Sequence, residues 1–286
     1  MEPITTTPET GDVVGAPRPA RRHWSLDDIP WDEIRRDEVR GNTALFCMLA
    51  AASLMESATD LYTANLIEYF EGEDEITSWL RDSWLPEELQ HGRALRRYVE
   101  TAWPDFPWEQ VRLGFVEEFR PFCDEALEAA RGLEMASRCV VETGTASFYT
   151  CLSRAGGEPV LTLLTRRIAE DEIRHYKHFY RFFRKYRDRE GSRRIAVLAA
   201  LCRRLRMTGG EDRIIPLKHV QRARQPGVPF DARRYRRLQR ECRALMRPHF
   251  PIEMTVRMLL KPLGLSPRTQ RLTLPVVTAV ARRIAP

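Results

Sequence analysis

Two copies of a Glu-x-x-His motif occur in the chain, Glu88-Leu-Gln-His91 and Glu172-Ile-Arg-His175. Residues three apart on an α-helix point in the same direction, so the carboxylate and the imidazole of each motif can bind one metal ion. The chain has six histidines, so a single match of this kind is weak evidence. Two matches, each inside a long stretch of helical periodicity, indicate a dinuclear metal site.

A further glutamate lies where a helical hairpin would bring it level with the first motif. Gly72 is the natural pivot of the polar turn between predicted helices at 43–70 and 75–103. Glu56 precedes this glycine by 16 residues, and Glu88 follows it by 16. In an antiparallel hairpin the two carboxylates therefore lie at the same height.

The second motif has the same relation to a second turn. Gly157 separates a predicted helix at 122–154 from another at 158–187. Glu142 precedes this glycine by 15 residues, and Glu172 follows it by 15. The two hairpins together can thus collect four glutamates and two histidines in one place.

The chemistry of these side chains predicts the cofactor. Burying several carboxylates without cations is costly, because each ion loses hydration that the protein interior does not replace. Four carboxylates and two imidazoles suit iron or manganese better than metals that prefer thiolates. We predict two Fe ions, with two Mn ions or a mixed pair as the alternative, bound by Glu56, Glu88, His91, Glu142, Glu172 and His175.

Two polar residues flank the second motif on the same predicted helix. Asp171 can accept a hydrogen bond from the imidazole of a ligand, or it can be an exposed acid near Arg174. His178 continues the helix face one turn beyond His175 and is therefore a candidate for an extra ligand. Support of the ligands or core packing fits His178 better, because the set of six ligands is already complete.

The spacing of apolar residues predicts an all-α protein. Pro and Gly separate long stretches of helical periodicity, and alternating strand-like runs are missing. Pro86 is expected to kink the helix that contains it. Beyond the four long helices, the pattern predicts basic helices near 191–207 and 231–247, a loop at 208–227, and short helical pieces over 251–286.

The long connection between the hairpins, residues 104–121, favours a ferritin-like four-helix bundle with additional C-terminal helices. We expect a disordered tail at 1–22, the bundle at 23–190 and a basic helical extension at 191–286. The first 22 residues contain no apolar run, and no apolar stretch has the length of a membrane span. A cytoplasmic location without a transmembrane segment is therefore expected.

The formal net charge of +6 is unevenly distributed. Residues 181–247 hold 21 Lys and Arg against six Asp and Glu, a local excess of +15. Such a block can meet nucleic acid, a membrane surface or an acidic protein, or it can be a set of solvated arginine-rich helix faces. We expect an acidic protein partner and no nucleic acid. The six cysteines show no paired spacing, which argues against a disulfide framework or a zinc knuckle.

Four segments resemble the soluble acyl-acyl-carrier-protein desaturases of the ferritin-like di-iron carboxylate superfamily. These segments are Met55-Glu-Ser-Ala-Thr-Asp-Leu-Tyr62, Trp84-Leu-Pro-Glu-Glu-Leu-Gln-His-Gly92, Glu142-Thr-Gly-Thr145 and Ile168-Ala-Glu-Asp-Glu-Ile-Arg-His175. The resemblance covers about half of the chain and implies metal ligation by the six residues given above. The position of Pro86 and the arginine-rich C-terminal half depart from the family pattern.

The resemblance also implies an activity. The family uses dioxygen as co-substrate and two electrons from an external donor such as ferredoxin, and it oxidises an unactivated C–H bond of an acyl chain. Thr145, one turn after Glu142, would place a hydroxyl near the oxygen-binding side. Alternatively, this threonine bonds a backbone carbonyl in its own helix. The basic block would dock an acidic acyl carrier protein, and a homodimer is the expected assembly.

The leading hypothesis is thus a di-iron oxidoreductase that desaturates or hydroxylates an acyl chain, and other functions fit the same ligands. An N-oxygenase or another small-molecule di-iron oxygenase would differ in its substrate. A ferroxidase or iron-storage protein needs no organic substrate, and the long basic C-terminal region argues against it. A non-catalytic binding protein that keeps a relic metal site is the last alternative.

Overall fold

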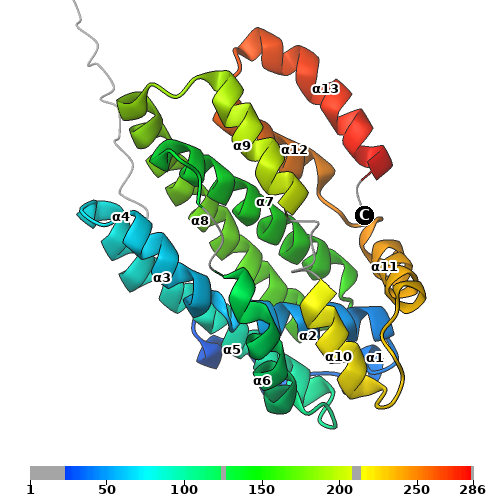
Figure 1. The fold of residues 1–286 in the computed structure, drawn as a ribbon. Helices are drawn as coiled ribbons and strands as arrows, with labels where there is room; N and C mark the ends of the chain where they lie inside the picture. The colour runs from blue at the N-terminus through cyan, green and yellow to red at the C-terminus, as the bar shows by residue number, and fades with distance from the viewer. Residues whose placement is uncertain (1–22, 124–126, 208–213, 285–286) are drawn as a thin grey trace, which may run out of the picture.

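All regular secondary structure in the described part of the computed structural model is helical (Figure 1). The structure describes residues 23–123, 127–207 and 214–284. The prediction of an all-α protein is therefore confirmed. The tail expected at 1–22 lies outside the described residues.

The first helical hairpin packs α2 (Thr43–Glu56) and α3 (Thr59–Tyr69) against α5 (Leu85–Ala102). Its turn contains Gly72, whose φ of +82° lies in the left-handed region. Glycine adopts this conformation without the steric cost that a Cβ atom would bring. The predicted pivot of this hairpin is therefore present.

The prediction of one continuous helix over 43–70 is wrong. Ser57 and Ala58 separate α2 from α3, and the two helices are bent by 41°. Near the break, Ser57 Oγ and Thr59 Oγ1 donate to backbone carbonyls three residues earlier, and such bonds compete with the helical ladder. The break leaves Glu56 as the last residue of α2.

No single described helix is long and apolar enough to cross a membrane. Helices α2 and α3 reach that length and apolar content only when they are taken together across this bend.

The returning half of this hairpin forms in three segments: α4 (Asp74–Trp79), a π-helical turn (Leu80–Trp84) and α5. Pro86 lies in the first turn of α5, where a missing N–H is tolerated. The irregularity expected near this proline thus takes the form of a π-helical segment on its N-terminal side. π-Helical turns rotate the side chains that follow them, and here the first motif follows.

The second hairpin consists of α7 (Arg131–Ala155) and α8 (Pro159–Glu190), which pack along each other. The turn contains Gly157 with φ of +68°, and the buried carboxylate of Glu158 caps α8 by accepting the amides of Val160 and Leu161. α7 begins at Arg131, not near residue 122 as predicted, because the chain first makes a 3-10 turn over Arg120–Phe122.

The connection between the hairpins, predicted only as a long crossover, contains a helix. Within 104–121 the chain forms α6 (Trp108–Phe119), which buries Trp108, Val111 and Phe115. These residues follow helical spacing, so one face of α6 is apolar. A helix in a crossover still allows the second hairpin to lie beside the first.

The loop predicted at 208–227 is also wrong in part. Residues 214–224 form α10 (Ile214–Arg224), which packs on α2 and α6. Ile215 and Val220 are buried there, and this tertiary burial outweighs the local Gly, Pro and charge content that favoured a loop. The rest of the predicted loop lies partly outside the described residues.

The other C-terminal helices form an outer layer around the hairpins (Figure 1). α9 (Arg194–Met207) and α12 (Ile252–Leu260) pack on α7, whereas α11 (Ala232–Met246) packs on α2 and α7. α13 (Pro267–Ile284) packs on α12 and lies at the edge of the molecule. The two basic helices predicted near 191–207 and 231–247 are therefore present as α9 and α11.

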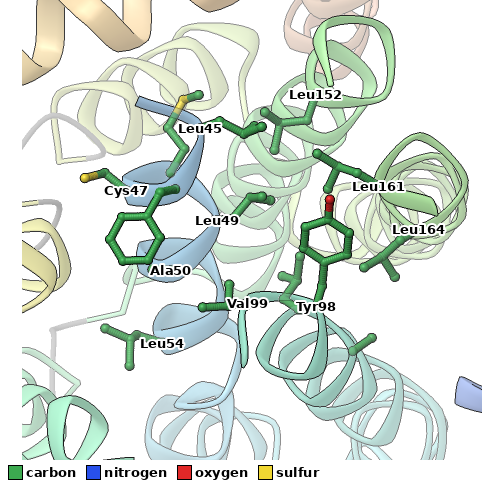
Figure 2. Packing of buried hydrophobic residues seen from close by; sticks show 14 of the residues in the cluster. Leu45, Cys47, Leu49, Ala50, Leu54, Tyr98, Val99, Leu152, Leu161 and Leu164 are labelled. Carbon is green, nitrogen blue, oxygen red and sulfur yellow. The ribbon is translucent and has the colours of Figure 1, made fainter. Parts of the chain in front are cut away.

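The main apolar core lies between the two hairpins (Figure 2). Tyr98 of α5 extends toward the start of α8, and its hydroxyl donates to Glu158 at 2.9 Å. This bond satisfies a buried phenol and a buried carboxylate together. The core side chains around Tyr98 include Leu45, Leu49 and Leu54 of α2, Val99 of α5, Leu152 of α7, and Leu161 and Leu164 of α8.

The close approach of α5 to the break after α2 generates a stability prediction. A Cβ atom on Gly92 would lie 2.7 Å from the backbone nitrogen of Ser57, so Gly92→Ala must push the two helices apart. We expect this change to lower the free energy of unfolding by about 1–3 kcal/mol, as overpacking does.

Gly144→Ala in α7 is the matched control, because nothing lies within 4 Å of its Cβ position. The control should stabilise the protein by roughly 0.5–1 kcal/mol, and chemical denaturation of both variants measures the difference. Equal stability of the two variants would contradict the close approach.

Candidate metal centre

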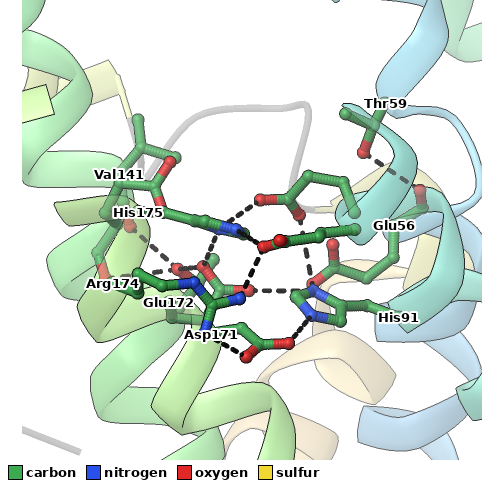
Figure 3. A network of polar contacts seen from close by, with 12 residues as sticks. Glu56, Thr59, His91, Val141, Asp171, Glu172, Arg174 and His175 are labelled. Carbon is green, nitrogen blue, oxygen red and sulfur yellow. Dashed lines mark hydrogen bonds and ion pairs between the residues drawn. The ribbon is translucent and has the colours of Figure 1, made fainter. Parts of the chain in front are cut away.

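The six predicted ligands lie together in the interior: Glu56, Glu88, His91, Glu142, Glu172 and His175. Figure 3 labels Glu56, His91, Glu172 and His175 among them. Glu56 ends α2, and the other carboxylates and imidazoles come from α5, α7 and α8. The exposed fractions of all six lie between 0% and 8%. Ionisable side chains are almost never buried to this degree unless they are paired or bind a metal.

The six residues form two overlapping groups, and in each group one ligand atom per residue lies within 4.8 Å of the others. The first group is Glu56, Glu88, His91 and Glu172, and the second is Glu88, Glu142, Glu172 and His175. Glu88 and Glu172 belong to both groups. A carboxylate has two oxygens, so each of these two glutamates can serve two adjacent ions.

The inner nitrogen of each imidazole faces the carboxylates. His91 Nδ1 lies 3.3 Å from Glu172 Oε1, and His175 Nδ1 lies 2.9 Å from Glu88 Oε1. Neither nitrogen has a partner in hydrogen-bond geometry within the described part of the chain, and Glu142 Oε2 and Glu172 Oε1 also lack one there. Leaving a buried polar atom unsatisfied costs about 1–3 kcal/mol. Four such atoms converging on one place fit a site for metal ions.

The outer nitrogen of each imidazole is held by an acid on the opposite helix. His91 Nε2 lies 3.1 Å from Asp171 Oδ2, and His175 Nε2 lies 2.7 Å from Glu87 Oε2. These contacts orient the rings and keep the Nδ1 atoms free for another ligand. Asp171 thus lies where the sequence analysis placed it as an acceptor.

Glu87 was missed by the sequence analysis, although a signal for it exists. The acid pair Glu87-Glu88 precedes His91 in the same way that Asp171-Glu172 precedes His175. Each motif is therefore an acidic residue followed by Glu-x-x-His. The first acid of each motif contacts the imidazole of the other motif.

Arg174 connects the two outer acids. Its guanidinium donates to Asp171 Oδ1 at 2.8 Å and to Glu87 Oε2 at 2.6 Å. Trp24 Nε1 also donates to Asp171 Oδ2, at 2.7 Å. Burial alone raises the pKa of Asp171, but the hydrogen bond with His91 and the positive charges of His91 and Arg174 lower it below its usual range. The outer acids are therefore ionised and suited to hold a ring N–H.

Two hydroxyl groups contact the inner carboxylates. Tyr149 donates to Glu56 Oε1, a contact that the sequence analysis did not foresee. Thr145 Oγ1 lies 2.7 Å from Glu172 Oε2 and 3.2 Å from the carbonyl of Glu142. The bond to Glu172 is the shorter one, so the threonine both touches the cluster and remains within reach of its own helix.

His178, the candidate for an extra ligand, belongs to neither group of converging side chains. Its ring stacks on Trp79 with 5.0 Å between centroids and 14° between planes. Burial, followed by the nearby positive charges, lowers the pKa of His178. The ring therefore packs as a neutral aromatic group beside the cluster.

The protonation of the cluster follows from burial and from its own contacts. Burial and the neighbouring carboxylates raise the pKa of Glu56 and Glu142 well above the usual range. Burial also opposes the charged forms of His91 and His175, but hydrogen bonds to the surrounding acids raise the pKa of both imidazoles well above the usual value. These shifts favour a proton on Glu56 and Glu142 and the charged form of His91 and His175 when no metal is bound.

The pKa of Glu88 and of Glu172 shifts the other way. Burial raises the pKa of both, yet the close contacts with His175 and His91 lower it below the usual range. Four carboxylates, two neutral imidazoles and two divalent ions sum to zero, so two bound ions would neutralise the charge of these six side chains.

No model of a known protein family matches the chain, and no curated protein matches it with significance. The chemistry of the cluster itself is therefore the basis on which a function is inferred.

Exchange of protons for metal generates a second prediction. Uptake of two divalent ions must displace protons from Glu56, Glu142, His91 and His175, because each would otherwise enter the site in its protonated form. We expect the release of up to four protons per two ions near neutral pH and a steep loss of metal affinity as the pH falls. Calorimetric titration with Fe(II) or Mn(II) in buffers of different ionisation enthalpy measures this number. Metal uptake without proton release would contradict the assigned protonation states.

Proposed function

We propose that the chain is a ferritin-like di-iron oxidoreductase that uses dioxygen to oxidise a C–H bond of an acyl chain. The observation that carries the proposal is the pair of buried Glu/His groups that share Glu88 and Glu172. Glu88 and Glu172 would help to hold both ions, and two bound metal ions would supply dioxygen chemistry. The desaturase-like segments on α2, α3, α5, α7 and α8 support the choice of reaction.

Each of the two ions would be bound by a different subset of the six cluster residues. Glu56 and His91 would complete one site, Glu142 and His175 the other, and the shared glutamates would bridge them. When bound, two iron ions would supply the activation of dioxygen that amino-acid side chains alone cannot perform. Iron is preferred to manganese because of the resemblance, since the oxygen-rich donors accept both metals.

The remaining polar groups hold the inner ligands in place. Glu87 and Asp171 orient the imidazoles through their Nε2 atoms, and Tyr149 donates to Glu56. Thr145 donates to Glu172, and we infer that its hydroxyl also provides a proton donor on the oxygen-binding side. All of these residues lie on helices, which keeps the geometry rigid.

An acidic acyl carrier protein is the proposed substrate carrier, and an external donor such as ferredoxin is the proposed source of electrons. α11 supports a carrier, because it exposes the side chains of Arg233, Arg234, Arg236, Arg237 and Arg240. An acidic protein would meet a complementary charge there, and the encounter should weaken with salt.

Metal content and product formation test the proposal. Protein reconstituted with Fe(II) should bind about two iron equivalents, the number that such a donor set serves. With reduced ferredoxin, dioxygen and an acyl carrier protein thioester, it should form a desaturated or hydroxylated acyl chain, measured by mass spectrometry. Glu142→Ala and Glu172→Ala should lose both properties, whereas Glu68→Ala on the exposed face of α3 should keep them.

The two readouts separate the levels of the proposal. Absence of bound iron after reconstitution would contradict both the proposed metal centre and the proposed function. Two bound irons without any oxidised acyl product would leave the metal centre standing and remove the acyl substrate.

The hydroxyl of Thr145 can be tested on its own. Thr145→Val keeps the shape of the side chain and removes the bond to Glu172. We expect full iron occupancy with about tenfold less product per dioxygen consumed, because a hydrogen bond to a charged group contributes roughly 1.5–3 kcal/mol. Thr165→Val is the matched control, since that buried hydroxyl donates to the carbonyl of Leu161 in its own helix. Unchanged product yield in Thr145→Val would make Thr145 a packing residue.

A further inference from the structure

The C-terminal helix α13 carries an exposed apolar stripe, which we define as Leu272, Val276, Val280 and Ile284. The exposed fractions of these side chains are 76%, 63%, 52% and 74%, respectively. Residues four apart lie on one face of a helix, so the stripe runs along α13 from its second turn to its end. Single exposed apolar side chains are common, but a continuous row of four marks an interaction surface.

The face of α13 that contacts the protein is a different one. Thr278 is buried, and α13 packs on α12, which in turn packs on α7. At 3.6 residues per turn, Thr278 lies roughly on the opposite side of the helix from the centre of the stripe. The stripe therefore points away from the molecule, in agreement with the outlying position of α13 in Figure 1.

Positive charge accompanies the stripe. Arg268, Arg271, Arg282 and Arg283 are exposed on the same helix, and none of them forms an ion pair within the part of the chain that the structure describes. Residues 254–286 contain six Lys and Arg and no Asp or Glu. By helical spacing, Arg268 lies on one flank of the stripe and Arg283 lies within it, whereas Arg271 and Arg282 lie nearer the side of Thr278.

We propose that α13 is an amphipathic anchor that lays its apolar stripe on an anionic lipid surface. A helix with an apolar face, arginines at both ends and no acid has the composition of helices that lie in the plane of a membrane interface. The arginine stems can lie along the acyl boundary while the guanidinium groups reach the phosphates. The proposal concerns α13, which packs on α12 and contributes no residue to the Glu/His cluster, and it goes beyond the oxidoreductase function.

A second copy of the chain fits the stripe less well. Pairing two α13 helices would bring the arginines of both copies together, and neither helix offers an acid to neutralise them. Like charges in contact oppose association, whereas an anionic surface attracts every one of these arginines. Charge complementarity therefore selects the lipid surface.

Flotation with lipid vesicles tests the anchor. The full chain should float with vesicles of phosphatidylcholine and phosphatidylglycerol at low salt, much less with phosphatidylcholine alone, and less at high salt. The triple variant Leu272→Ser, Val276→Ser, Val280→Ser should lower the vesicle partition coefficient by at least about tenfold. Changing Arg268, Arg271, Arg282 and Arg283 to Gln should remove the preference for anionic vesicles.

Matched controls separate the stripe from general surface properties. Leu113→Ser removes an apolar side chain that is 60% exposed on α6, and it should float like the unmodified protein. Arg233→Gln with Arg236→Gln removes exposed charge from α11 and should also preserve flotation. Circular dichroism of each variant checks that the helices are intact, and the arginine variants test the proposal should the apolar variant unfold.

Two results would overturn the proposal. Absence of flotation with anionic vesicles at low salt is one, and equal flotation of the stripe variant and the Leu113→Ser control is the other. If the stripe variant instead changed from dimer to monomer in light scattering while vesicles bound neither form, a second copy would be the occupant. Iron content of the stripe variant should be unchanged, so failure of the anchor and failure of the metal centre are distinguishable.

Discussion

The buried charge of the Glu/His cluster is the constraint on which the rest of the structure depends. Six ionisable side chains occupy the interior with almost no access to water. Such a group is tolerable only if its charges cancel internally, by shared protons or by cations. Each helix that contributes to the cluster must therefore be held in register, since a shift of one residue would leave a carboxylate alone in the core.

The two halves of the cluster hold each other in place. Glu87 of α5 contacts His175 of α8, Asp171 of α8 contacts His91 of α5, and Arg174 binds both acids. These contacts between α5 and α8 hold the two hairpins together at the level of the cluster. The two helical irregularities also adjoin it: the break after Glu56 ends α2 at an inner carboxylate, and the π-helical turn precedes the first motif. Regular helices over both segments would have directed those side chains differently.

Much of this arrangement was predictable, because it depends on spacing along helices. The turns at Gly72 and Gly157 and the convergence of six ligand candidates follow from equal distances to a pivot. What escaped prediction depends on contacts between distant segments. The end of α2 lies where local hydroxyl groups bond the backbone and where Gly92 approaches Ser57 closely. Residues 214–224 form helix α10 where they pack on α2 and α6. Glu87 was missed because adjacent acids look alike until a partner imidazole distinguishes them.

The positive charge of the C-terminal half cannot be assigned to the cluster. Four carboxylates and two neutral imidazoles would be neutralised by two divalent ions, without charge from the C-terminal helices. Part of the excess is neutralised by acids of the chain, since Arg189 pairs with Glu73 and Arg203 pairs with Glu128. No arginine of α13 forms an ion pair among the described residues, although Arg282 is close enough to Glu253 to help lower the pKa of that acid. The remaining counter-charge must come from solvent ions or from an anionic surface that the helix contacts. An apolar row beside those arginines favours the surface, because solvent ions neutralise charge but leave exposed apolar area in water.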